Sequence, residues 1–171
     1  MKQITLVLLG ATLLTGIVPA ISSARVTTIP HKVSVIRVLD GDTIKVKKEG
    51  KIVTVRLYGI DAPELPRAHR PGQPFSLLSQ DRLCKYICGQ DVDLLIKNTD
   101  RYGRLVGIVY TDTNVNLEMV KEGYAWAYRA YLKKSEKEYV EAENEAKFTK
   151  LGLWNNSGNP QAPWLYRKQY R

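Results

Sequence analysis

Short clusters of apolar residues, separated by turn residues, dominate the first part of the chain. Three such clusters lie at residues 33–38, 43–46 and 52–58, and they are divided by Asp40-Gly41-Asp42 and by Lys48-Glu49-Gly50. Apolar runs of this length bounded by turns predict strands, and the short connections predict a three-stranded meander. Two further strands are expected at residues 91–96 and 105–110.

The segments between and after these strands carry helical patterns. Residues 62–74 contain four prolines and Gly72, which predict a loop. Apolar residues at helical spacing then predict a helix over 76–88, ended by Gly89. A short helix is expected at 116–122. Ser135 and Glu138 form a capping-box pattern that predicts a last helix reaching about residue 150.

Together these elements predict an α+β fold. Five short strands, one helix between the third and fourth strands, and helices near the end are typical of a five-stranded Greek-key barrel of the oligonucleotide-binding type, with about three helices.

The N-terminus has the three-part pattern of a secretory signal. Lys2 is followed by a mostly apolar, uncharged stretch and by the small residues Ser22-Ser23-Ala24. The alternative is an uncleaved anchor, but Gly10, Gly16 and Pro19 weaken a spanning helix. We expect residues 1–24 to be a cleaved signal, 25–32 a leader, 33–154 one domain and 155–171 a C-terminal tail. The protein would then be secreted or periplasmic, without stable membrane insertion after cleavage.

The net charge of the chain limits the classes of partner that it is expected to bind. The net charge of the 171 residues is +9, and all but one unit remains after residue 24. Such an excess on one small domain favours polyanions, with nucleic acid ahead of anionic envelope surfaces.

The two cysteines, Cys84 and Cys88, lie four residues apart near the end of the expected helix. On a regular helix their Cβ atoms would be about 5–6 Å apart, further than the ~3.5–4.5 Å of a disulfide. Packing as two reduced core side chains is therefore favoured, although an oxidising compartment and a distorted helix end would permit a bond.

Clustered acids and arginines carry the candidate chemistry. The meander brings the end of the third strand beside the start of the second, so Asp42, Asp61 and Glu64 are expected to converge. Oxygen-only ligands favour a hard cation such as calcium or magnesium. Arg56 and Arg104 are suited to clamp a phosphodiester, because a guanidinium matches phosphate oxygens in a two-pronged way. The simpler alternatives are that Asp40-Gly41-Asp42 is only a hairpin turn and that the arginines form ordinary salt bridges.

The order of these motifs resembles the staphylococcal nuclease (thermonuclease) family. The resemblance rests on Asp40-Gly41-Asp42-Thr43, Arg56-Leu57, Ile60-Asp61-Ala62-Pro63-Glu64 and Asp100-Arg101-Tyr102-Gly103-Arg104, and runs from about Val33 to Trp154. It differs from the type member in having Ala62 in place of a threonine, a shorter segment from Leu65 to Phe75, the cysteine pair, and the C-terminal tail.

The resemblance implies roles for eight residues. Asp42, Asp61 and the backbone carbonyl of Ala62 would bind calcium, and Arg56 and Arg104 would hold the scissile phosphate as catalytic residues. Glu64 would act on the attacking water, while Arg101 and Tyr102 would lie along the bound nucleotide. The implied activity is calcium-dependent endonucleolytic hydrolysis of DNA and RNA by a monomer, leaving 3′-phosphate ends.

Two other functions fit the same charge. A non-catalytic oligonucleotide-binding barrel would hold nucleic acid without cutting it, but such proteins typically lose acids or arginines that this chain keeps. An envelope protein that binds anionic polymer would leave the acid–arginine set unexplained.

Overall fold

The computed structural model describes residues 29–155 and 160–170. The predicted signal, residues 1–24, lies outside this range, as do residues 25–28 of the predicted leader. Within the described part of the chain, no helix is both long and apolar enough to cross a bilayer.

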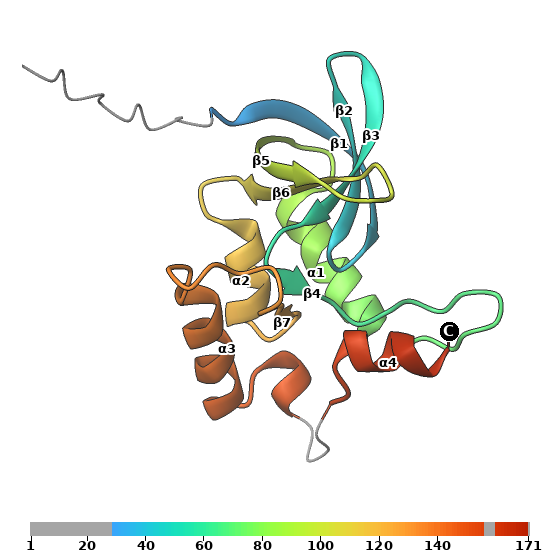
Figure 1. The fold of residues 1–171 in the computed structure, drawn as a ribbon, viewed down its shortest axis with the longest axis vertical. Coiled ribbons are helices and arrows are strands. Elements are labelled where there is room, and N and C mark those ends of the chain that lie inside the picture. The colour runs from blue at the N-terminus through green and yellow to red at the C-terminus, as the bar shows by residue number, and fades with distance from the viewer. Residues whose placement is uncertain (1–28, 156–159, 171) are drawn as a thin grey trace, which may run out of the picture.

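Five strands close into a barrel in the order β1-β2-β3-β6-β5 (Figure 1). They are β1 (His31–Asp40), β2 (Thr43–Lys48), β3 (Lys51–Leu57), β5 (Asp91–Thr99) and β6 (Leu105–Tyr110). β3 and β6 pair in parallel and the other four neighbours are antiparallel. The five-stranded barrel of oligonucleotide-binding type predicted from the sequence is confirmed.

The first strand is longer than expected. His31 and Lys32, placed in the leader by the sequence, pair with Leu94 and Asp93 of β5. Their backbone groups complete the ladder that closes the barrel. Because their side chains are polar, the hydrophobic pattern did not predict a strand at these two residues. Period-two alternation is clear in β2, where Val46 is fully buried and its neighbours Lys45 and Lys47 are exposed.

Four α-helices and a 3₁₀ turn surround the barrel in the described residues. They are α1 (Ser76–Ile87), α2 (Val115–Lys121), α3 (Glu138–Phe148), η1 (Gly152–Asn155) and α4 (Pro163–Gln169). Figure 1 shows α1 crossing beneath the barrel and α2 and α3 stacked to one side. Two short strands that the sequence did not predict, β4 (Ile60–Asp61) and β7 (Trp126–Ala127), pair with each other below it.

The predicted capping box at Ser135 is wrong. α3 begins at Glu138, its N-cap is Lys137, and no side chain caps it. Residues 133–136 form a separate turn, in which the Glu136 side chain accepts a hydrogen bond from the Lys133 N–H at 2.9 Å and another from Tyr58 at 2.7 Å. This tertiary contact with β3's end fixes the turn ahead of the helix.

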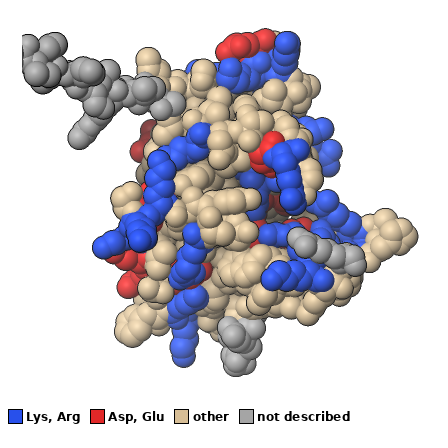
Figure 2. Space-filling view, in the orientation of Figure 1, with Lys and Arg blue, Asp and Glu red and all other residues tan. Residues whose placement is uncertain are grey.

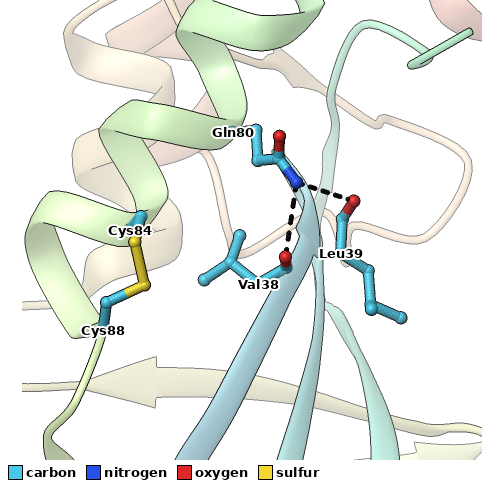
Figure 3. The surroundings of a disulfide bond; sticks show 5 residues. All are labelled: Val38, Leu39, Gln80, Cys84 and Cys88. Atoms are coloured by element: carbon cyan, nitrogen blue, oxygen red, sulfur yellow. Dashed lines mark hydrogen bonds between the residues drawn. A yellow bond between two sulfur atoms is a disulfide. The ribbon is translucent and has the colours of Figure 1, made fainter.

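The apolar stripe that the sequence indicated on α1 is buried at Leu83 and Ile87 but not at the start of the helix. Leu77 is 62% exposed, whereas Ser76 and Ser79 are buried with Leu83 and Ile87. Ser79 is buried because its hydroxyl donates to the Tyr124 carbonyl at 2.7 Å. The helix is also tied to the end of β1, since Gln80 Nε2 donates to the carbonyls of Val38 and Leu39 at 3.3 and 3.0 Å (Figure 3).

Cys84 and Cys88 form a disulfide (Figure 3), so the preference for two reduced side chains is wrong. The helix ends at Ile87, and Cys88 has extended backbone angles of φ −63° and ψ 130°. The pair therefore does not have regular helical spacing, and its Cα atoms are 4.7 Å apart, inside the usual range for a disulfide.

The segment predicted as a tail contains α4, which packs on the rest of the protein. Ala162 is buried in a cluster with Trp126 and Leu153, and Trp164 packs against this cluster. Figure 1 shows α4 beside the long loop that joins β4 to α1. The division of the chain into signal, leader, domain and tail stays a prediction.

Candidate active site

The tight turn between β1 and β2 directs Asp42 into the protein. Gly41 packs so closely on α1 that an added Cβ would lie 2.0 Å from Ser79 Oγ and 2.7 Å from Ala62 Cβ. The Asp42 N–H donates to Asp40 Oδ1 at 3.1 Å, which closes the turn. Asp42 is consequently only 4% exposed.

Asp42 and Asp61 converge on one guanidinium. Arg56 lies in β3, opposite Thr43 of β2, and its Nη1 contacts Asp42 Oδ1. Its Nη2 lies 2.5 Å from Oδ1 of Asp61, a fully buried residue of β4. A buried carboxylate pair would repel without this cation, because unpaired charges are costly away from water.

Ala62 joins the same group through its backbone. Its N–H donates to Asp42 Oδ2 at 2.6 Å, and Asp42 Oδ1 also accepts from the Thr43 hydroxyl at 2.9 Å. The structure thus brings Asp42, Asp61 and Ala62 together, as the sequence predicted. Their assignment as metal ligands stays a prediction.

Glu64 is held by two arginines. Its Oε2 lies 2.5 Å from Arg70 Nη2, and its Oε1 lies 2.9 Å from Arg167 Nη1. The Glu64 backbone N–H donates to Gln73 Oε1 at 3.0 Å. Glu64 therefore has a fixed side chain at the edge of the acid group, and both carboxylate oxygens accept from cations.

Arg167 links Glu64 to Asp61. Its two terminal nitrogens contact the two oxygens of Asp61 at 2.9 and 2.8 Å, so the pair is bidentate. Burial alone would lower the pKa of Arg167, but the hydrogen bonds and the charges of Asp61 and Glu64 outweigh burial and raise that pKa above its ordinary value. The guanidinium is a permanent cation of this site.

A second group of residues comes from the turn between β5 and β6. Arg104 Nε donates to Asp100 Oδ2 at 2.8 Å, and Asp100 Oδ1 accepts from the backbone N–H groups of Tyr102 and Arg104. Burial alone would raise the pKa of Asp100, but these hydrogen bonds hold the pKa below its ordinary value. Asp100 thereby orients Arg104.

Arg101 and Tyr102 lie at the tip of this turn. Tyr102 is 68% exposed, and the guanidinium groups of Arg101 and Arg104 lie 4.9 and 5.7 Å from the centre of its ring. An exposed aromatic ring between two cations is a suitable surface for a base and its phosphates.

Both groups of residues open onto one cleft of about 780 Å³. Its lining includes Arg56, Glu64, Arg101, Tyr102, Arg104 and Arg167, together with Asp42. Asp61 and Ala62 lie behind this wall, and both are buried. Six arginines against four acids line the cleft, so an anionic ligand such as a phosphodiester is favoured there.

The donor chemistry suits a hard cation, but the carboxylates face arginines here. Asp42 and Asp61 offer oxygen alone, which calcium prefers. Within residues 29–155 and 160–170, no three His, Cys, Asp or Glu side chains are grouped so as to hold a metal ion. Metal binding at Asp42 and Asp61 would therefore require the arginine contacts to rearrange.

Sequence reasoning missed Arg70 and Arg167. Nothing distinguished Arg70 within its proline-rich loop. For Arg167 there was a local signal, since Pro163 at the first helical position and Arg167-Lys168 in the last turn are helix boundary residues. That signal predicts the helix and leaves its tertiary position undetermined.

Comparison of the sequence with known proteins identifies a family for this chain. The family described as Staphylococcal nuclease homologue matches residues 54–156, more than half of the chain. A "Micrococcal nuclease" of Shigella flexneri is 42% identical over 144 residues, covering 78% of this chain and 79% of the relative. An "Uncharacterized endonuclease" of Escherichia coli O157:H7 is 39% identical over 135 residues, covering 78% and 82%. An "Uncharacterized endonuclease" of Haemophilus influenzae is 38% identical over 137 residues, covering 79% and 72%. The matched region contains Arg56, Asp61, Glu64 and Arg104, and the chain belongs to the staphylococcal nuclease family.

Proposed function

We propose that this protein is an exported, calcium-dependent nuclease that hydrolyses phosphodiester bonds of DNA and RNA. The observation that carries the proposal is that Arg56, Arg104, Glu64 and Asp42 line one cleft, with Asp61 directly behind its wall. Membership of the family and the names of the relatives support the same reaction class.

Arg56 and Arg104 are the residues that would hold the scissile phosphate. Each presents a planar fork of donors that fits two phosphate oxygens. Arg56 comes from β3 and Arg104 from the turn between β5 and β6. Carboxylates orient both side chains: Asp42 and Asp61 orient Arg56, and Asp100 orients Arg104. Pre-oriented donors of this kind stabilise the negative charge that builds up as the phosphorus becomes five-coordinate.

Glu64 would act on the attacking water. The water oxygen forms a bond to phosphorus, one water proton passes to Glu64, and the bond from phosphorus to the 5′ oxygen breaks. The 5′ oxygen leaves and takes up a proton from solvent water, Glu64 returns its proton to solvent, and the phosphate remains on the 3′ end. Arg70 keeps Glu64 in place by its contact with Oε2, while Oε1 shares Arg167 Nη1 with Asp61.

Asp42, Asp61 and the carbonyl of Ala62 would hold the calcium ion. The ion supplies positive charge beside the phosphate and lowers the pKa of bound water. Alanine would suffice at position 62 because a backbone carbonyl ligand needs no particular side chain, and the Ala62 N–H bond to Asp42 keeps this backbone beside the acids.

The substrate would be held by charge and stacking. Figure 2 shows Lys and Arg side chains spread over the visible face, with fewer acidic groups among them. Contacts to phosphate and aromatic stacking do not distinguish bases, so DNA and RNA would both be accepted. The segment 1–24 would export the protein to the periplasm or the medium, where it would act as a monomer.

The test is digestion of single-stranded DNA and of RNA with calcium, with magnesium, and with a chelator. We expect calcium to support cleavage of both polymers and chelation to abolish it. Magnesium should substitute poorly, because it demands a more rigid octahedral shell than calcium. Binding of both polymers without cleavage under any metal would instead identify a non-catalytic binding barrel.

A further inference from the structure

The contact of Arg167 with the acid group comes from outside the barrel. Residues 54–156 carry the family match, whereas Arg167 lies in α4. Its guanidinium contacts both oxygens of Asp61 and one oxygen of Glu64, at 2.8–2.9 Å. The side chain is 32% exposed, so its outer edge faces the cleft.

Side chains rather than backbone pairing attach α4 in the described residues, including the packing of Trp164 on the cluster of Trp126 and Leu153. The Tyr166 hydroxyl donates to the Pro71 carbonyl, Gln73 Nε2 donates to the Gln161 carbonyl at 2.8 Å, and Trp164 lies 5.6 Å from the ring of Tyr128. Arg56, by contrast, is fixed within the barrel by pairing on both sides of β3. Segments outside the hydrogen-bonded core are the ones that open at low free-energy cost.

Arg167 and a cation at Asp61 require the same oxygen atoms. A calcium ligand must present its oxygen to the ion at about 2.3–2.6 Å. Both oxygens of Asp61 already accept from Arg167, and Oδ1 also accepts from Arg56 at 2.5 Å. A divalent ion beside the same carboxylate would repel the guanidinium, because like charges at this range interact strongly where water is scarce.

We propose that Arg167 is an internal competitor of the metal, so that α4 acts as a plug that calcium displaces from Asp61 and Glu64. The inference rests on the calcium site of the proposed function and adds regulation to it. In the closed form the acid group is neutralised by α4. Displacing Arg167 frees Oδ2 of Asp61 for the ion and Oε1 of Glu64 for the attacking water, while Arg56 keeps its contact with Oδ1 of Asp61.

The test is calcium binding by titration calorimetry on the folded, chelator-treated chain, with calcium chloride alone and no nucleic acid. Competition lowers apparent affinity by the fraction of molecules in the open form. Removing the bidentate contact by Arg167→Gln should therefore tighten calcium binding by roughly tenfold, the equivalent of about one charge-assisted hydrogen bond. Arg167→Lys, which keeps the charge and loses the fork, should lie between the parent and Arg167→Gln.

Two further variants separate this plug from a general charge effect. Lys168→Gln removes the same charge from the same helix, at an exposed position that forms no ion pair within the described residues. It should leave the calcium affinity within about twofold of the parent, because exposed charges are screened. Tyr166→Phe keeps Arg167 but removes the hydrogen bond to Pro71, and should tighten binding by severalfold. Melting curves without calcium would show that all variants are folded.

The outcomes are distinct. Tighter binding for Arg167→Gln and Tyr166→Phe, with little change for Lys168→Gln, supports the plug. Equal or weaker calcium affinity for Arg167→Gln overturns the plug and leaves the calcium-dependent nuclease in place. The absence of calcium binding in the parent and in every variant would instead overturn the calcium site of the proposed function.

Discussion

Glu64→Gln tests the catalytic group and its surroundings in one variant. Glu64 accepts from Arg70 at one oxygen and from Arg167 at the other. The amide keeps one oxygen and replaces the second by an NH₂ group, which would face a guanidinium donor. If the three acids stood without cations, this change would relieve repulsion between them and leave folding near normal. With both oxygens paired to arginines, there is no such repulsion to relieve.

The magnitude follows from these contacts. Losing one charge-assisted hydrogen bond costs about 1.5–3 kcal/mol, and the value near the lower end applies because Arg167 is partly exposed. A loss of about 2 kcal/mol corresponds to a melting temperature lower by roughly 4–8 °C for a domain of this size. Turnover per folded molecule should fall by about 10²–10⁴, the range for a general base.

Urea unfolding and kcat, measured on the same samples below the melting range, separate the two effects. Glu145→Gln is the matched control, since Glu145 is exposed on α3 and forms no ion pair within the described residues; its stability should stay within about 0.5 kcal/mol of the parent. Parental stability of Glu64→Gln would refute the paired geometry. Parental kcat per folded molecule would refute the role of Glu64 in activating water.

Three further predictions concern the other side of the cleft. Arg104→Lys keeps the charge but loses the fork, so kcat should fall by about 10²–10³ with little change in KM; early melting with parental kcat would contradict this. The lowered pKa of Asp100 adds stability that is complete above the ordinary carboxyl pKa of about 4 and is lost as pH falls through the lowered value. Unfolding measured across this range should therefore show a smaller acid loss for Asp100→Asn, and identical pH profiles would exclude the ion pair with Arg104. Single-stranded DNA binding should weaken steeply with salt, and Tyr102→Ala should raise KM more than it lowers kcat, whereas salt-independent affinity would count against phosphate contacts.

Local patterns were sufficient for the barrel. Strands β2 and β3 are short and joined by turn residues, and β2 alternates from Ile44 to Lys47, as does the end of β3, where Val55 and Leu57 are buried on either side of the half-buried Arg56, so pattern and structure agree there. The pattern failed where tertiary contacts replaced it. Ser79 is buried on α1, where it bonds to Tyr124 and packs against Gly41, whereas the apolar Leu77 is exposed.

In the candidate site, too, part of the arrangement was predictable from the sequence and part was not. The order of acids and arginines along the sequence predicted that Asp42 and Asp61 converge, because a meander places these strand ends side by side. The sequence could not show that Arg56 joins the two carboxylates, or that Glu64 is held from both sides. Those contacts depend on side-chain positions that the strand pattern does not specify.

What the sequence by itself determined is the barrel, the identity of the charged residues, and their order in the chain. Only the tertiary structure decided that the disulfide forms and that α4 returns to the cleft. Cys88 can reach Cys84 because the helix ends one residue earlier, and Arg167 reaches Asp61 across 106 residues. A contact over such a separation leaves no periodic signal along the chain, because it arises from packing between surfaces that exist only after the barrel has closed.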